Sequence, residues 1–148
     1  IEQWSIGFNW RPTKRISLDS SFNYYHFDAP ENVGYQNVKN KEVFTNEFSR
    51  TKLNLQFTKE LSLRLIADYY FFSPNIELFD GDDIIKQFEF DALLTYLVNP
   101  FTAFYLGYNT GYENFDEDPQ GFRRQRSGFP DYLTQQQFFL KLTYLFQF

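Results

Sequence analysis

The chain has 148 residues, with 20 Phe, 11 Tyr and 2 Trp but neither Cys nor Met. Aromatic residues make up 22% of it, yet the mean hydropathy is −0.50, so apolar and polar residues must be interleaved. No apolar stretch approaches the ~20 residues of a membrane helix, which excludes a helical membrane protein. The absence of Cys excludes a disulfide framework and a thiolate metal site. A net charge of −5 argues against nucleic acid as a partner.

Alternation with period two runs along almost the whole chain and predicts seven β-strands. The expected strands cover residues 1–11, 15–26, 43–58, 61–72, 84–97, 101–110 and 134–148. Most have about ten residues or more, which exceeds the ~5–6 of a typical soluble strand. This length suits a tilted membrane-spanning strand of ~9–11 residues.

Each expected strand has two unlike faces. One face is apolar and rich in aromatic residues, and its expected residues include no charged side chain. The opposite faces carry eight charged residues, which we expect to face an enclosed aqueous lumen: Asp19, Arg50, Lys52, Arg64, Asp68, Glu89, Asp91 and Lys141.

The hairpin turn at residues 58–60 predicts how some of these charges meet. Its register places Arg50 opposite Asp68, and the following strand is expected to bring Glu89 and Asp91 close to Arg64. Such a charged ladder would set ion preference at a pore constriction. The alternative is that cross-strand pairs only satisfy one another inside a wet barrel.

The connections alternate between short and long. Tight turns are expected at residues 11–15, 58–60 and 97–100, and long polar loops at about 27–41, 73–83 and 110–131. Short turns on one side and long loops on the other are typical of transmembrane barrels, as are aromatic girdles near both strand ends. We therefore predict an all-β, transmembrane, antiparallel up-and-down β-barrel formed by a single segment over residues 1–148. A soluble β-sandwich, which also alternates, is the alternative.

Seven is an odd number, whereas bacterial single-chain barrels have an even number of strands. With no initiator Met or leader, the start is expected to be a processed or truncated end. We therefore expect the C-terminal part of a larger barrel, or a barrel completed by two or more chains.

The chain ends in LTYLFQF, with aromatic residues at alternate positions Tyr144, Phe146 and Phe148. This ending resembles the C-terminal signal of Gram-negative outer-membrane proteins, which the barrel-assembly machinery reads. The resemblance implies the Gram-negative outer membrane as the location. It implies outer-membrane lipid, lipopolysaccharide, the assembly machinery and other outer-membrane proteins as partners.

A narrower resemblance covers most of the chain. The segments RPTKRISLDSSFNYY, TKLNLQFTKELSLRLIADYY and FFLKLTYLFQF look like the C-terminal barrel domain of unknown function in Bacteroidota-type outer-membrane proteins. That domain typically follows a carbohydrate-binding module of the family-nine-like fold, which this sequence does not contain. Many relatives have RPN or RPS plus a basic residue where this chain has RPTKR. No catalytic residue carries over from the resemblance.

Other candidate sites are weak. Asp80, Asp82 and Asp83 could hold a hard cation, but they lack calcium-loop spacing, and a solvated acidic loop is favoured. The single His, His26, is the only possible base of a Ser–His–Asp hydrolase. We expect no cofactor, no established metal site and no enzymatic activity.

Three functions remain open. The first is an outer-membrane pore or membrane anchor linked to carbohydrate binding or uptake. The second is the C-terminal strands of an energy-coupled transporter whose barrel holds a plug. The third is an outer-membrane hydrolase.

Overall fold

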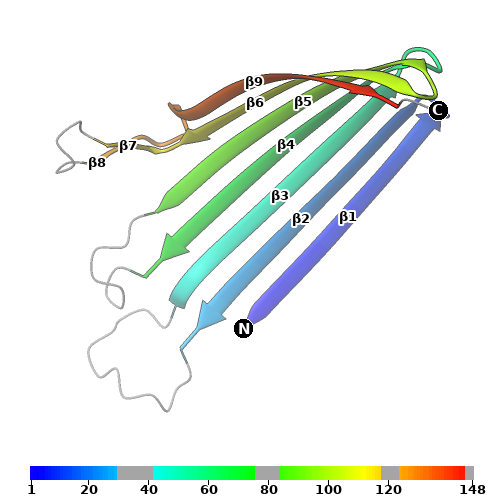
Figure 1. Ribbon diagram of the computed structural model, residues 1–148. Helices are drawn as coiled ribbons and strands as arrows, with labels where there is room; N and C mark the ends of the chain where they lie inside the picture. Colours follow the sequence, from blue (N-terminus) through cyan, green and yellow to red (C-terminus); the bar gives the residue numbers. More distant parts are fainter. Residues whose placement is uncertain (30–41, 76–83, 118–123, 146–148) are drawn as a thin grey trace.

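The computed structural model describes residues 1–29, 42–75, 84–117 and 124–145, and all regular secondary structure in these ranges is β-strand. The seven long strands are β1 (Glu2–Thr13), β2 (Ile16–Asp28), β3 (Glu42–Gln56), β4 (Leu61–Pro74), β5 (Ile85–Asn99), β6 (Thr102–Glu113) and β9 (Tyr132–Tyr144). They lie side by side in one curved sheet, in which each long strand pairs with the next along the chain (Figure 1). The prediction of seven up-and-down antiparallel strands is confirmed.

The sheet is open. In the described part of the chain, β1 pairs with β2 alone and β9 pairs with β6 alone, so the first and last strands do not meet. The described residues therefore form a curved wall and not a closed barrel.

Three tight turns lie at one end of the sheet, here named the turn end, and each is fixed by a side-chain oxygen. The Arg15 amide donates to Thr13 Oγ1 (3.2 Å), and the Leu61 amide donates to Thr58 Oγ1 (3.0 Å). In the third turn, the Phe101 amide donates to Asn99 Oδ1 (2.8 Å). Because Thr and Asn side chains can replace a backbone acceptor in a tight turn, these residues fix where each hairpin reverses.

The opposite end of the sheet, the loop end, differs from expectation after β6. The segment at 110–131 was predicted as a loop, but β6 continues to Glu113, and β7 (Phe115–Glu117) pairs with β8 (Arg124–Arg126). Asn114 joins the two parts, because its Oδ1 accepts from the Lys86 amide and its Nδ2 donates to the Ile84 carbonyl, both at 2.8 Å. An Asn side chain thus continues the β5–β6 pairing where the backbone alternation stops.

The register keeps the apolar side chains on one side of the sheet through all seven strands, and this side is here named the apolar face. Directly opposed residues of paired strands project to the same face. One such row across the sheet reads Trp10, Leu18, Leu53, Leu65, Ala92, Tyr108 and Phe138.

Nothing in the described chain covers either face. Ala103 is the single buried hydrophobic residue among the described positions, and none of their large side chains is fully buried. The sheet is therefore one layer without a core of its own.

Charged residues enter the apolar face near the loop end. Glu47 lies opposite Tyr24 and Phe71, and the Lys86 Nζ atom lies 5.8 Å from the centre of the Phe71 ring. No charge was predicted on this face, because the apolar faces predicted for β3 and β5 began closer to the turn end, at Thr51 and Phe88. From Tyr69 toward the turn end, β4 presents only uncharged side chains on this face.

Gly107 of β6 allows a close approach of the Phe139 ring from β9. A Cβ added at Gly107 would lie 1.9 Å from Phe139 Cε1, whereas a Cβ at Gly7 would meet nothing within 4 Å. We expect Gly107→Ala to lower the free energy of unfolding by about 1 kcal/mol, since the ring must move off its partner strand. Urea unfolding in detergent micelles would measure this.

Gly7→Ala is the matched control, and its effect should stay within about 0.5 kcal/mol. Equal effects of the two substitutions would show that the Phe139 contact does not stabilise the β6–β9 pair.

Candidate functional site: the polar face of the sheet

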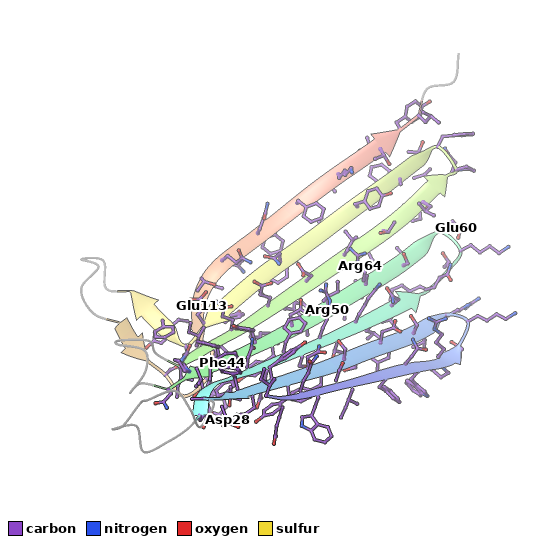
Figure 2. The ribbon with its side chains drawn as sticks, turned by 90° about the horizontal axis from the view of Figure 1, so that it is seen from below. Asp28, Phe44, Arg50, Glu60, Arg64 and Glu113 are labelled. Atoms are coloured by element: carbon purple, nitrogen blue, oxygen red, sulfur yellow. The ribbon has the colours of Figure 1, made fainter. Side chains whose placement is uncertain are left out.

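The face opposite the apolar face, here named the polar face, brings together the eight charged residues that were expected to share one side. Arg50, Asp68 and Glu89 form one row of directly opposed residues on β3, β4 and β5. The next row toward the turn end contains Asp19, Lys52 and Asp91 on β2, β3 and β5. Figure 2 shows Arg50 and Arg64 in the middle of the sheet, between Glu60 at the turn end and Asp28 at the loop end.

One ion pair lies at the centre of this face. Arg50 Nε is 3.6 Å from Asp68 Oδ1, and the Arg50 side chain is half exposed while that of Asp68 is mostly covered. Asp68 also lies directly opposite Glu89. The centre therefore places two adjacent carboxylates beside one guanidinium.

The expected position of Arg64 is wrong in part. Arg64 lies opposite Asn54 on β3, but its partner on β5 is Leu93 and not Glu89 or Asp91. Asp91 is thus a diagonal neighbour of Arg64, and Glu89 lies two residues further along. The β3–β4 register could be predicted because a tight turn joins these strands. The β4–β5 register could not be predicted because a long connection permits several registers.

Amide side chains extend the polar network across the later strands. Asn109 Nδ2 donates to Asp91 Oδ1 (2.5 Å), and Gln135 Nε2 donates to Asn109 Oδ1 (2.9 Å), which links β5, β6 and β9. Gln87 Nε2 donates to Glu113 Oε1 at 3.0 Å. The parity of Gln87 and Asn109 predicts that both lie on this face, but only its charged residues were predicted as site residues.

The same pattern joins the first three strands. Ser5 Oγ donates to Asn23 Oδ1 (2.9 Å), and Asn9 Nδ2 donates to the carboxylate of Asp19. Asn54 Nδ2 donates to Ser17 Oγ at 3.0 Å. At the other side of the sheet, the Lys141 Nζ atom lies 5.8 Å from the centre of the Tyr105 ring. Together with the Arg50–Asp68 ion pair, cross-strand polar contacts thus join β1 to β4, and a second set joins β5 to β9.

Aromatic residues gather on the polar face at the loop end. The rings of Phe27 and Phe44 are stacked with centres 5.8 Å apart, and Phe44 contacts Phe72 at the same separation. These residues lie in the same alternation as Arg50 and Asp68, but near the ends of the expected strands. This cluster was not predicted, because Phe27, Phe44 and Phe72 lie at or just beyond the ends of the predicted strands.

His26 lies at the loop end of β2, on the apolar face. Its Nδ1 is 2.9 Å from Thr45 Oγ1, and its Nε2 is 3.1 Å from Asp28 Oδ1. The Thr45 hydroxyl donates to Glu42 Oε1 (2.7 Å), so it can only accept from the imidazole. His26 is therefore not placed to remove the proton of the Thr45 hydroxyl, whereas the base of a hydrolase must remove the proton of its nucleophile.

Several predicted site residues lie outside the described part of the chain. These are Asp80, Asp82 and Asp83 of the weak metal candidate and Phe146 and Phe148 of the C-terminal pattern. Tyr144, the remaining member of that pattern, is the last residue of β9 and lies opposite Thr102. Among the residues that the structure describes, no group of three or more His, Asp or Glu side chains could hold a metal ion.

Replacing His26 separates a structural role from a catalytic one. We expect His26→Ala to lower the free energy of unfolding by about 1 kcal/mol, because two cross-strand or local hydrogen bonds are lost. The rate of hydrolysis of a soluble nitrophenyl ester should equal the buffer background for the unmodified protein and for His26→Ala. Thr45→Val is the companion variant, and a parallel loss of ester hydrolysis in both variants would instead indicate a hydrolase.

Comparisons with known proteins add no relative. No family model, curated protein or solved structure matches the chain. Within the described residues, no helix is both long and apolar enough to cross a membrane. The chain is thus characterised by its own geometry: one open seven-stranded sheet with an apolar face and a polar face.

Proposed function

We propose that this chain is a wall segment of an outer-membrane β-barrel, with the apolar face against lipid and the polar face toward enclosed water. The observation that supports this most strongly is the continuous apolar face, which the described chain leaves uncovered. A single sheet layer must bury an apolar face against something, because a structure without a core is not stable in water.

The exposed side chains on the apolar face are large. Eleven of them are at least 41% exposed: Trp4, Ile6, Phe8, Trp10, Tyr96, Phe104, Leu106, Phe138, Leu140, Leu142 and Tyr144. Burying a large apolar side chain contributes about 1.5–3 kcal/mol, so covering all eleven would contribute on the order of 20 kcal/mol. Acyl chains can cover such a face over its whole area without any shape-matched partner.

The strand dimensions also support a membrane. Strands of 12–15 residues are about 40–50 Å long. Tilted by about 45°, they span about 28–35 Å, which matches the ~30 Å hydrocarbon core of a bilayer.

The stagger between strands agrees with such a tilt. Along one row of opposed residues, Trp10 lies three residues before the end of β1 at Thr13. Phe138 in the same row lies six residues before the end of β9 at Tyr144. A progressive offset of this kind is what a tilted, closing sheet requires.

Closure needs strands beyond these seven. β1 and β9 both run from the loop end to the turn end, so they are parallel to each other. An antiparallel barrel would therefore contain an odd number of additional strands between them, from a larger protein or from another chain.

The polar face supports a pore over a purely structural wall. Its central row of Arg50, Asp68 and Glu89, with Asp91 beside it, would form a charged constriction in a closed barrel. We propose a pore or membrane anchor linked to carbohydrate binding or uptake. The link to carbohydrate and the location in the Gram-negative outer membrane rest on the sequence resemblances, as do the lipid, lipopolysaccharide and assembly-machinery partners. The alternative is the end of an energy-coupled transporter, which would require a plug domain elsewhere in the protein.

Adjacent residues on opposite faces provide a test of the membrane proposal. Leu65 belongs to the apolar face and Ile66 to the polar face, between Lys52 and Asp91. We expect Leu65→Arg to make folding into phosphatidylcholine vesicles less favourable by about 2–4 kcal/mol, because the charge would enter hydrocarbon.

Ile66→Arg is the matched control and should change that free energy by no more than about 1 kcal/mol. If both variants behave alike, or if the protein folds without lipid or detergent, the apolar face does not contact a membrane.

Conductance tests the pore. In planar bilayers, the complete protein that contains this chain should give discrete current steps. Glu89→Gln combined with Asp91→Asn should shift the reversal potential toward that of anions, since two carboxylates leave the polar face. Glu47→Gln removes a carboxylate from the apolar face and should leave the reversal potential unchanged. A protein that inserts but gives no current steps would contradict the pore function and would leave the membrane-anchor function as the proposal.

A further inference from the structure

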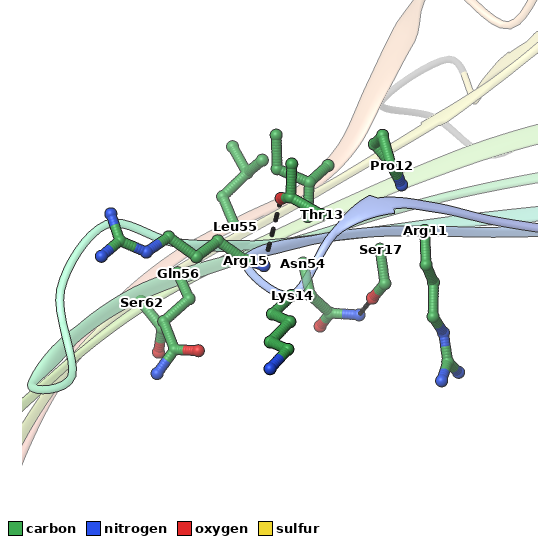
Figure 3. Close-up of a pocket in the computed structure, with 11 residues that line it drawn as sticks. Arg11, Pro12, Thr13, Lys14, Arg15, Ser17, Asn54, Leu55, Gln56 and Ser62 are labelled. Carbon is green, nitrogen blue, oxygen red and sulfur yellow. Dashed lines mark hydrogen bonds between the residues drawn. The ribbon is translucent and has the colours of Figure 1, made fainter.

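A cleft of about 870 Å³ lies at the turn end of the polar face, beside the turn that joins β1 and β2 (Figure 3). Three of its lining residues are cations: Arg11 lies near the end of β1, and Lys14 and Arg15 form the turn. Asn54 and Gln56 at the end of β3 form part of the other side, together with residues from the beginning of β2 and β4.

The cleft is strongly basic. No acidic residue lines it, and Arg11, Lys14 and Arg15 are all exposed. Among the described residues, none of these three cations lies within 4 Å of a carboxylate, in contrast to Arg50 at the centre of the sheet. The three positive charges are therefore not neutralised by the surrounding structure.

The shape of the cleft is held by the backbone. The register of β1 and β2 shifts between Trp10 and Thr13, so the strand alternation is interrupted just before the turn. The Gln56 amide donates to the Arg15 carbonyl at 2.7 Å, which ties the turn to β3. Figure 3 shows the Arg11 and Lys14 side chains on the same side of the sheet as the Asn54 and Gln56 side chains.

Neutral hydrogen-bonding groups complete the lining. The Ser17 hydroxyl accepts from Asn54 Nδ2, which fixes this amide at the floor of the cleft. The amide of Gln56 and the hydroxyl of Ser62 add further donors nearby. Guanidinium groups bind phosphate through two parallel hydrogen bonds, and a Lys adds a point charge.

We propose that this cleft binds a phosphate-bearing anion. Its three cations would neutralise the charge, and the amides and hydroxyls would orient the phosphate oxygens. The proposal rests on the geometry of the polar face alone, so it holds whether or not the barrel conducts ions. The hydrogen-bonding side chains of its lining, Ser17, Asn54, Gln56 and Ser62, belong to the polar face, which favours the phosphate of a dissolved molecule over that of a lipid headgroup.

Calorimetric titration of the complete protein in a nonionic detergent tests the proposal, with inorganic pyrophosphate as the probe. We expect saturable binding that weakens as salt increases. Replacing Arg11, Lys14 and Arg15 together with Gln should weaken binding by about tenfold or more. The single variant Lys14→Gln, at an exposed turn position, should reduce binding even if the triple variant folds poorly.

Lys59→Gln is the matched control, because Lys59 lies in the neighbouring turn and does not line the cleft. It should leave binding unchanged. In a second titration, pyrophosphate is omitted, and the added probe is phosphatidylglycerol in micelles of the same detergent. Binding to pyrophosphate supports a dissolved phosphate, whereas cleft-dependent binding to phosphatidylglycerol alone supports a headgroup. Absence of both, or an equal loss in Lys59→Gln and Lys14→Gln, would overturn the proposal.

Discussion

The structure depends on one constraint: in paired antiparallel strands, directly opposed residues project to the same side of the sheet. A slip of one residue between any two strands would move a whole set of side chains to the wrong face. Here the rows stay in phase from β1 to β9, and the irregularities in register occur near strand ends, as between Trp10 and Thr13 or between Gly111 and Tyr112. The two faces therefore keep separate chemistry over the whole width of the sheet.

This separation explains why the fold was readable from the sequence. Residues 61–68 alternate between apolar and polar residues at every position but Ile66, and β4 begins at Leu61, as predicted. The β3–β4 register was also readable, because Thr58 caps a tight turn and fixes the opposition of Arg50 and Asp68. Local chemistry and strand periodicity gave the same answer in that hairpin.

Other features depend on information that is not local. The neighbours of Arg64 on β5 follow from a long connection, whose length permits several registers. The short β7–β8 pair has only three residues in each strand, too few for alternation to identify it. The basic cleft depends on a shift of register just before a turn, and the residues of that turn were interpreted only as a connection. Closure of the sheet depends on which strands pair with β1 and β9. The periodicity of each strand does not predict these partners.

The distribution of charge along the strands has a consequence of its own. The turn end carries Arg11, Lys14, Arg15 and Lys59 against the single carboxylate of Glu60. At the loop end of the seven long strands, Lys86 is set against five carboxylates: Glu2, Asp28, Glu42, Glu47 and Glu113. The wall is thus an electric dipole whose axis follows its strands. An ion travelling along the polar face gains electrostatic energy in one direction and loses it in the other, so passage through a barrel built from such a wall would rectify, with unequal currents at opposite voltages.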